Sequence, residues 1–331
     1  MNRFIAEFEE QSFTQIIFPH KNSDWNDYLE LAEKNFVDII NQIIKYQKCL
    51  VVCDNVNYVK SHFKENKNLY FVEYQTDDTW ARDCSALSVY NSNKLEILNF
   101  TFNAWGEKFE AKKDNNMSRK ISHKYNLPLK DIDFILEGGA VESNGDGILL
   151  TTSACQFNKN RNYNLSDEEI IKTLKTTLNV NEVLSLNHGY LAGDDTDSHI
   201  DTLARFIDKN RIVYVGCDDE NDEHYKELQL MKKELESFKE SYNFELIELP
   251  LPSPIYFEDE RLPATYANFL FVNGAVLVPI YNVKEDCLAL DIFKQTFKDL
   301  DIIPVDCSTL IRQHGSLHCV TMNFPKGIEL D

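Results

Sequence analysis

Residues 166–178 (SDEEIIKTLKTTL), followed by 182–186 (EVLSL) and 193–201 (GDDTDSHID), contain the three features from which the fold is predicted. Ser166 and Glu169 occupy the positions of a capping box, which predicts that a helix begins there. The short apolar run after the helix is typical of a buried strand. The last segment places four aspartates and one histidine within nine residues, so its carboxylates require a cation nearby.

A helix followed by a strand occurs five times along the chain of 331 residues. This alternation is typical of α/β proteins, and no repeat, linker or shift in composition marks a domain boundary. We therefore expect one α/β domain over residues 1–331, made of about five similar units. A radial arrangement would bring strand ends from every unit to a central pocket, whereas a doubly wound open sheet is the alternative. The predicted helices cover residues 25–44, 117–125, 166–178, 222–241 and 285–297, and the strands after them cover 49–53, 133–136, 182–186, 244–249 and 302–305.

The longest apolar stretch, residues 268–281, has Asn273-Gly274 at its centre. That dipeptide predicts a type I′ turn between two strands, which excludes a membrane helix. The first residues of the chain lack the apolar core of a secretory signal. Eight cysteines occur without any C-x-x-C pair, so neither a disulfide framework nor a zinc ribbon is indicated. We expect a cytoplasmic protein with reduced thiols.

The charge of the chain restricts its partners. Hydrophobic residues make up 43% of the sequence and charged residues 27%, which describes a globular rather than a disordered protein. The formal net charge is -20, and phosphate binding needs clustered lysine and arginine. Nucleic acid and anionic membranes are therefore not expected as partners, and a small cation would be attracted.

Four polar clusters follow strand-like runs in four different units of the chain. Together they supply one thiol, one imidazole and three carboxylates. A thiol becomes nucleophilic near neutral pH only beside an imidazolium or another positive charge. Two carboxylates that face each other can hold a planar cation such as guanidinium by bidentate hydrogen bonds. The residues are Cys319, His199, Asp83, Glu137 and Asp201.

Five motifs occur in order along nearly the whole chain. They are DDTWARD (77–83), EGG (137–139), NKNRN (158–162), GDDTDSHID (193–201) and LHCVT (317–321). In this order the chain resembles the agmatine deiminases, which belong with the bacterial-type peptidylarginine deiminases in the guanidine-modifying superfamily. Glycine is usual in that family at position 198 and before the cysteine. This chain has Ser198 and His314 there, so its loop geometry and substrate preference can differ.

The resemblance implies a five-bladed α/β-propeller (pentein) built from ββαβ-type units around a central active site. It also implies hydrolysis of agmatine to N-carbamoylputrescine and ammonia, a step of putrescine biosynthesis, with no metal or organic cofactor. The partner would be a small cationic guanidine, with neither nucleic acid nor membrane. The sequence leaves a homo-oligomer open.

The resemblance also implies a role for each residue of the four clusters. Cys319 would attack the guanidinium carbon and form an amidino-thioether. His199 would protonate the departing ammonia and then activate water. Glu137 would hold His199 and favour its charged form, while Asp83 and Asp201 would bind the guanidinium nitrogens.

Further roles concern the ends of the substrate. Trp80 would lie against its planar or alkyl part. The surplus acids of the loop, Asp195 among them, would meet the terminal ammonium of agmatine. Arg161 would be a buried scaffold residue that fixes its own loop. Free arginine would instead need a cation for its carboxylate, and the motifs offer only Arg82 and Arg161.

Two alternatives remain open at this stage. A peptidylarginine deiminase or another guanidine deiminase of the superfamily would use the same five residues. A metal-dependent hydrolase would use imidazoles and carboxylates as ligands and leave Cys319 without a role. The ligands of that second alternative would come from residues 188–201, namely His188, Asp194, Asp195, Asp197, His199 and Asp201.

Overall fold

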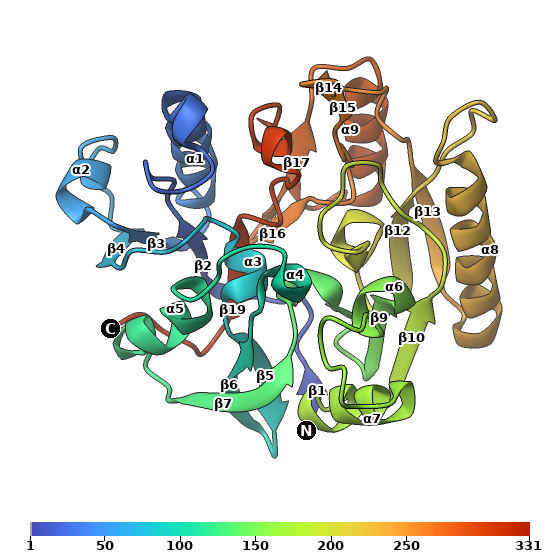
Figure 1. The fold of residues 1–331 in the computed structure, drawn as a ribbon, viewed down its shortest axis with the longest axis horizontal. Helices are drawn as coiled ribbons and strands as arrows, with labels where there is room; N and C mark the ends of the chain where they lie inside the picture. The colour runs from blue at the N-terminus through green and yellow to red at the C-terminus, as the bar shows by residue number, and fades with distance from the viewer. Residues whose placement is uncertain (1) are drawn as a thin grey trace.

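The structure, a computed structural model, describes residues 2–331. Residue 1, which the predicted domain includes, lies outside the described residues. The chain forms a mixed α/β fold in which sheets lie around the middle of the molecule and the longer helices lie outside them (Figure 1). Within residues 2–331 the strands form five sheets of three or four strands and one two-stranded hairpin.

The first sheet joins the two ends of the chain. Its order is β19 (Thr321–Pro325), β2 (Gln11–Ile17), β3 (Lys48–Cys53) and β4 (Leu69–Glu73). Strand β19 pairs antiparallel with β2, and β2 pairs parallel with β3. Helix α1 (Leu29–Ile43) connects the parallel strands, and α2 (Val56–Lys60) precedes β4.

The other four sheets repeat this plan of an antiparallel strand, a second strand, a helix and a parallel strand. The second sheet contains β1 (Arg3–Phe4), β5 (Leu87–Asn91), β6 (Lys94–Thr101) and β7 (Leu129–Ile135), with α5 (Asp114–Ile121). The third contains β8 (Glu142–Ser143), β9 (Ile148–Thr152) and β10 (Glu182–Leu186), with α7 (Asp167–Thr177). The fourth contains β11 (Ala204–Phe206), β12 (Arg211–Val215) and β13 (Glu245–Leu249), with α8 (Tyr225–Tyr242). The fifth contains β16 (Leu270–Val272), β17 (Ala275–Ile280) and β18 (Asp301–Asp306), with α9 (Glu285–Thr296).

Short elements lie between these units. Strands β14 (Tyr256–Phe257) and β15 (Glu260–Arg261) form the hairpin. Single turns of helix follow several strands, and two of them carry predicted site residues. These turns are α3 (Ala81–Cys84), α4 (Ala104–Glu107), α6 (Ser153–Gln156) and the 3-10 turns Asn26–Tyr28, Ser122–Lys124, Gly138–Ala140, Ile200–Thr202 and Leu310–Gln313.

All five predicted helix-then-strand steps are confirmed. Strand β10 has the predicted bounds, and the capping box of Ser166 and Glu169 begins α7. The first helix begins later than predicted because residues 26–28 form a separate 3-10 turn. The strands lie in separate sheets, so the doubly wound open sheet is wrong.

The predicted turn at Asn273-Gly274 connects β16 to β17, but its type is not I′. Gly274 has a φ of +83°, whereas Asn273 is not among the residues with positive φ, and a type I′ turn needs both. The Asn273 amide explains the difference. Its side-chain oxygen accepts from Gln11 N at 2.9 Å, its Nδ2 donates to Gln11 O at 2.8 Å, and its backbone N donates to Gln47 Oε1 at 2.8 Å.

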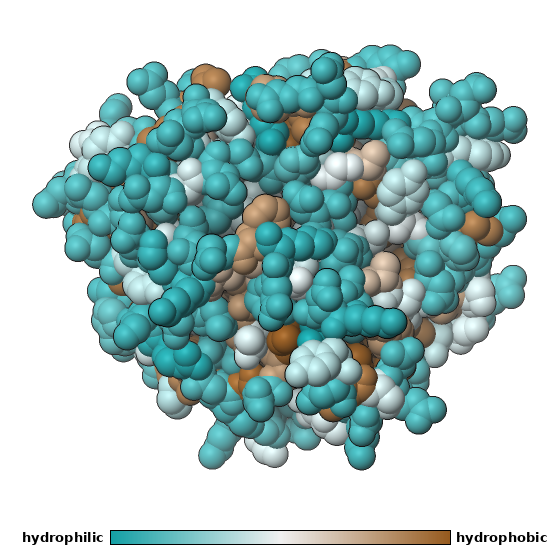
Figure 2. Space-filling view, viewed as in Figure 1, coloured by the Kyte–Doolittle hydropathy of each residue, from teal (hydrophilic) through white to brown (hydrophobic). Residues whose placement is uncertain are grey.

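Hydrophobic side chains fill two buried clusters beneath a polar surface. Figure 2 shows hydrophilic residues over most of the face it presents, in agreement with the charge of the chain. No helix within residues 2–331 is long and apolar enough to cross a bilayer. In the larger cluster, Phe324 of β19 stacks on Phe13 of β2 with ring centroids 4.5 Å apart, and its ring lies 5.1 Å from that of Tyr125. These contacts join the last strand to the first units.

We predict that Phe324→Ala lowers the free energy of unfolding by about 3–5 kcal/mol, because it leaves a cavity between β19 and β2. Urea unfolding followed by circular dichroism measures the change. The control Tyr163→Ala removes a ring that is 84% exposed and is expected to change stability by about 0.5 kcal/mol or less. Equal losses in the two variants would contradict the stabilising role of the contacts between β19 and β2.

Candidate active site

A cavity of about 480 Å³ has the thiol of Cys319 and the carboxylate of Asp83 in its wall. Trp80 and Asp195 line the same cavity. Among residues 2–331, no lysine or arginine lines it, and His314 is its one basic side chain. Such a wall attracts cations and repels anions. The other acidic residues of the wall are Asp24, Asp77, Asp78, Glu110, Asp114 and Asp194.

Part of this acidity develops only near neutral pH. Burial raises the pKa of Asp78 to about 7, although Trp80 Nε1 donates to its Oδ2 at 2.8 Å. Burial also raises the pKa of Asp114 to about 8, although its two oxygens accept from the backbone N of Asp77 and Asp78. A cation that enters the cavity stabilises the ionised form of both carboxylates.

Gly139 lies where the predicted polar clusters meet. A β-carbon at this position would be 2.6 Å from His199 Nδ1, 2.9 Å from Asp83 Oδ1 and 3.1 Å from Asp201 Oδ2. Side chains do not approach this closely, so glycine is required. The EGG motif thus gives three site residues room to converge.

Asp83 is held by two donors. Helix α3 presents it, Gly139 N donates to Oδ1 at 2.8 Å, and Trp105 Nε1 donates to Oδ2 at 2.9 Å. Burial raises the pKa of Asp83; His199 opposes this rise and Asp201 adds to it. His199 Nδ1 lies 3.6 Å from Asp83 Oδ1. The carboxylate is therefore oriented before any ligand binds.

The carboxylate of Asp201 lies beside the thiol of Cys319. Cys319 Sγ is 4.0 Å from Asp201 Oδ2 and 3.4 Å from Asn268 Oδ1. Asp201 Oδ2 accepts from His318 Nδ1 at 2.6 Å, while the buried Oδ1 has no hydrogen-bond partner in the described chain. A buried unpaired carboxylate oxygen costs free energy, so this atom lacks a hydrogen bond that other buried carboxylate oxygens have.

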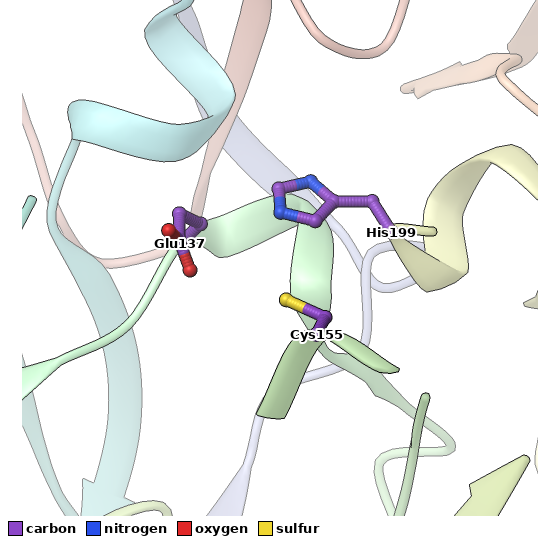
Figure 3. A group of neighbouring side chains, drawn as sticks. All are labelled: Glu137, Cys155 and His199. Carbon is purple, nitrogen blue, oxygen red and sulfur yellow. The ribbon is translucent and has the colours of Figure 1, made fainter. Parts of the chain in front are cut away.

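His199 is buried, and neither ring nitrogen has a hydrogen-bond partner among the described residues. One ring nitrogen faces Glu137 and Cys155 (Figure 3). Burial opposes the imidazolium, but Asp83, Cys155 and Glu137 outweigh it and raise the pKa of His199 to about 10. Burial raises the pKa of the Cys155 thiol as well, so near neutral pH the two carboxylates have the larger effect.

Glu137 is fully buried and ion-paired with Arg161. Arg161 Nε donates to both carboxylate oxygens, at 2.9 Å and 3.0 Å. The rest of the guanidinium binds the acidic loop, with Nη1 at 2.9 Å from Asp197 Oδ2 and Nη2 at 3.0 Å from Thr196 O. Arg161 is therefore buried and hydrogen-bonded as predicted, although its side chain binds Glu137 and the acidic loop and not its own loop. Its scaffold role stays a prediction. Glu137 and His199 lie close enough to interact electrostatically, but no hydrogen bond joins them.

The thiol of Cys319 is protonated in the free protein. Burial raises its pKa well above the usual value of 9.0, and the nearby Asp201 and Asp83 raise it further. A hydrogen bond with the backbone of Ser316 opposes this rise only in part. A cation bound between the two aspartates would cancel their effect and lower the pKa of the thiol.

The surplus acids of the acidic loop, Asp194, Asp195 and Asp197, have two different environments. Asp194 and Asp195 line the cavity, whereas Asp197 binds Arg161 and Lys108 and does not line it. The surplus acids that could meet a second cation are thus the first two. Asp195 Oδ2 also lies 4.0 Å from His314 Nδ1.

Two residues that replace the usual family glycine have left-handed backbone. Ser198 has a φ of 65° and His314 a φ of 63°. Side chains other than glycine, asparagine and aspartate seldom adopt this conformation, which costs about 1–2 kcal/mol for each residue. The surrounding contacts hold them there: Ser198 N donates to Asp194 Oδ2 at 2.7 Å, and His314 Nδ1 donates to Gly193 O at 2.7 Å.

The predicted metal ligands in residues 188–201 do not form a group of ligands within reach of one ion. His188 instead binds Glu227 at 2.9 Å. Among residues 2–331, the single group of three potential ligands within mutual reach is Glu137, Cys155 and His199, and Arg161 already neutralises Glu137. The cluster of residues 188–201 is therefore not supported as a metal centre.

Several site residues were not predicted. His318 stands beside Cys319 in the LHCVT motif, and this position was the only signal for it. Cys155, Trp105 and Asn268 gave no signal, because isolated residues of these types most often belong to a core.

Comparison with known proteins agrees with this geometry. The profile of the Porphyromonas-type peptidyl-arginine deiminase family matches residues 3–325. The structure of a C. jejuni agmatine deiminase cysteine-to-serine variant with substrate bound is 42% identical, with a TM-score of 0.95 over 99% of this chain and 98% of that chain. Agmatine deiminase of Enterococcus faecalis is 27% identical, with a TM-score of 0.90 over 98% and 96% of the two chains. Agmatine deiminase of Ectopseudomonas mendocina is 29% identical over 97% of this chain and 94% of its own.

We predict that Arg161→Met lowers the free energy of unfolding by about 3–5 kcal/mol, because it leaves Glu137 buried and unpaired. The control Arg211→Met breaks a partly exposed pair with Asp208 and is expected to cost about 1 kcal/mol or less. Chemical unfolding of both variants at pH 7 makes the comparison. A cost for Arg161→Met no larger than the control would contradict the scaffold role.

Proposed function

We propose, from the premise that this chain belongs to the Porphyromonas-type peptidyl-arginine deiminase family, that it hydrolyses agmatine to N-carbamoylputrescine and ammonia. The observation that carries the proposal is the position of the Cys319 thiol, which shares the cavity wall with Asp83 and lies 4.0 Å from Oδ2 of the buried Asp201. Within residues 2–331 no lysine or arginine lines this wall. Such a cavity suits a guanidinium with a second cation at the far end of an alkyl chain. Trp80 would lie along that chain.

Binding of the substrate prepares the nucleophile. Asp83 and Asp201 would accept hydrogen bonds from the guanidinium nitrogens. The bound cation would offset the charge of the two aspartates that raises the pKa of Cys319, so that the thiol releases its proton to solvent and becomes a thiolate. The same contacts hold the guanidinium carbon within attack distance.

Attack and departure of ammonia form the first half-reaction. The Cys319 thiolate adds to the guanidinium carbon and gives a tetrahedral intermediate. The raised pKa of His199, about 10, keeps a proton on its imidazole near neutral pH. That proton passes to the leaving nitrogen, the C–N bond breaks, and ammonia leaves an amidino-thioether on Cys319.

Hydrolysis completes the cycle. His199, now neutral, takes a proton from water, and the resulting hydroxide adds to the thioether carbon. Collapse of this intermediate expels the Cys319 thiolate and forms the carbamoyl product. Glu137 would favour the charged form of His199 through its proximity, since no hydrogen bond joins the two side chains.

Agmatine is preferred to arginine as substrate on electrostatic grounds. The α-carboxylate of arginine would meet Asp194 or Asp195, and within residues 2–331 His314 is the one basic side chain of the wall, already 4.0 Å from Asp195. Arg82 and Arg161 are buried and paired with other acids. A peptidylarginine deiminase is the second candidate, since a peptide lacks a free carboxylate at that point; the name of the matching family favours it.

The five sheets would form the blades of a single five-bladed propeller domain. Their shared order of strands supports this arrangement, and so does the meeting at Gly139 of three segments, which carry Asp83, Gly139 itself, and His199 with Asp201. The eight cysteines, none of them in a disulfide, support a cytoplasmic location.

We predict that agmatine gives the highest kcat/KM when ammonia release is compared with agmatine, free arginine and a peptide with C-terminal arginine. Arginine as the best substrate would overturn the assignment. In the same assay Cys319→Ala is expected to lower kcat by about six orders of magnitude, the scale found for loss of a covalent nucleophile. The control Cys287→Ala alters an exposed cysteine and is expected to leave the rate unchanged.

The raised pKa of Cys319 gives a second prediction. In the free protein its alkylation by iodoacetamide is expected to rise continuously from pH 7 to beyond pH 9, because the thiol form persists over this range. Mass spectrometry of the peptide that contains Cys319 measures the rate. A rate that reaches its plateau below pH 7 would mean that Cys319 rests as a thiolate.

A further inference from the structure

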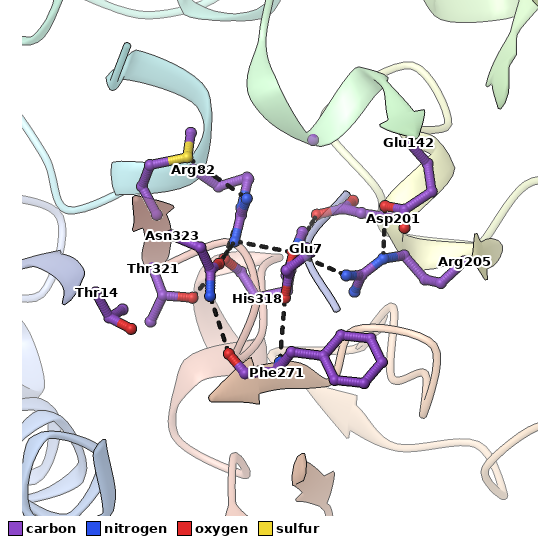
Figure 4. Close-up of polar contacts among 12 residues, drawn as sticks. Glu7, Thr14, Arg82, Glu142, Asp201, Arg205, Phe271, His318, Thr321 and Asn323 are labelled. Carbon is purple, nitrogen blue, oxygen red and sulfur yellow. Dashed lines mark hydrogen bonds and ion pairs between the residues drawn. The ribbon is translucent and has the colours of Figure 1, made fainter. Parts of the chain in front are cut away.

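His318 bridges two buried carboxylates behind the catalytic cavity. Its Nδ1 lies 2.6 Å from Asp201 Oδ2 and its Nε2 lies 2.5 Å from Glu7 Oε2 (Figure 4). All three side chains are at least nine-tenths buried. Glu7 comes from the segment between β1 and β2, so the bridge joins the start of the chain to the residue that precedes Cys319.

Both ring nitrogens of His318 must carry a hydrogen. Burial raises the pKa of Glu7, but His318, Arg205 and Arg82 outweigh it and leave the pKa lowered. Burial likewise raises the pKa of Asp201, and the hydrogen bond and charge of His318 leave it lowered. Two ionised carboxylates can only accept, so each nitrogen that faces one donates.

The buried charges around His318 balance only when it is a cation. Arg205 Nη2 lies 2.9 Å from Glu7 Oε2 and Arg205 Nε lies 2.8 Å from Glu142 Oε2. Arg82 Nη2 lies 3.4 Å from Glu7 Oε2. Burial raises the pKa of Glu142, and the charge of Arg205 opposes this rise. With Glu142 ionised and His318 charged, the cluster contains three cations and three carboxylates, and a neutral imidazole would leave one buried negative charge uncompensated.

We propose that His318 is a positioning residue which holds Asp201 ionised and fixes the orientation of its carboxylate beside Cys319. This inference rests on the proposed guanidinium binding by Asp201. The hydrogen bond to Oδ2 fixes the rotation of the carboxylate and keeps Oδ2 4.0 Å from Cys319 Sγ, while Oδ1 has no hydrogen-bond partner in the described chain. His318 touches neither the substrate nor the reacting atoms.

The ionisation of Asp201 depends on groups from several elements. The charged and titratable groups that act on it are His318, His199, Arg205, Arg82, Asp83 and Cys319. Of these, His318 is the only one within hydrogen-bond distance of Oδ2 apart from the weak thiol contact at 4.0 Å. Loss of its donor is therefore expected to raise the pKa of Asp201 more than any other single change.

Two variants separate positioning from general structural support. His318→Asn places an amide N–H near the position of Nδ1 and keeps the donor to Asp201, whereas His318→Gln places it near Nε2 and keeps the donor to Glu7. We expect kcat/KM to fall about 10- to 100-fold in His318→Gln, the scale of one charge-assisted hydrogen bond, and about tenfold or less in His318→Asn. The acidic limb of the kcat/KM profile is expected to move to higher pH only in His318→Gln.

The control His224→Gln alters another buried histidine that faces an aspartate, with its Nδ1 at 2.7 Å from Asp222 Oδ1. It is expected to lower stability without a shift of the acidic limb. Equal losses and no pH shift in both His318 variants would overturn the positioning role. The pH profile is measured with whichever guanidine the wild type hydrolyses best, so failure of agmatine as substrate does not decide this test.

A measurement without turnover keeps the inference testable if the variants fail to fold. Nitrogen-15 NMR of the wild-type protein at pH 7 is expected to show both ring nitrogens of His318 bonded to hydrogen. A neutral imidazole, with one nitrogen unprotonated, would overturn the inference even for an active agmatine deiminase. If both nitrogens are protonated and the wild-type protein does not hydrolyse agmatine, only the proposed function is contradicted.

Discussion

The burial of carboxylates around one point is the constraint on which the site depends. Asp83, Glu137 and Asp201 lie within a water-poor interior, and each would be costly there without compensation. Glu137 is ion-paired with Arg161, Asp83 accepts hydrogen bonds from two N–H groups, and Asp201 accepts one from His318. In the proposed function, the acceptor capacity that Asp83 and Asp201 retain beyond these donors binds a planar cation.

The same constraint explains the state of the nucleophile. Burial holds the proton on Cys319, and the negative charge of Asp201 and Asp83 adds to this effect. In the proposed mechanism the thiol therefore becomes a nucleophile only when the guanidinium binds. His199 is affected in the opposite sense, because the carboxylates that suppress the thiolate favour its imidazolium. Acid and nucleophile are thus set by one group of charges, and substrate binding changes the balance between them.

Much of this could be predicted from the sequence, for identifiable reasons. The helix-then-strand order follows from periodicity and capping, as at Ser166, and Cys319, His199 and the three acids stood in recognisable motifs. The predicted type of the turn at Asn273 was wrong because its side-chain amide binds Gln11 and its backbone N–H binds Gln47, which both lie far away in the sequence. His318, Cys155 and Trp105 were missed for the same reason: their roles come from partners that only folding brings near.

The most direct test of the account is acid quenching of the wild-type protein during turnover of agmatine, followed by mass spectrometry of its peptides. The account predicts that the peptide with Cys319 gains the mass of agmatine less ammonia, and that the adduct disappears when substrate is exhausted. Turnover at a normal rate with no adduct on Cys319, or an adduct on another residue, would contradict it.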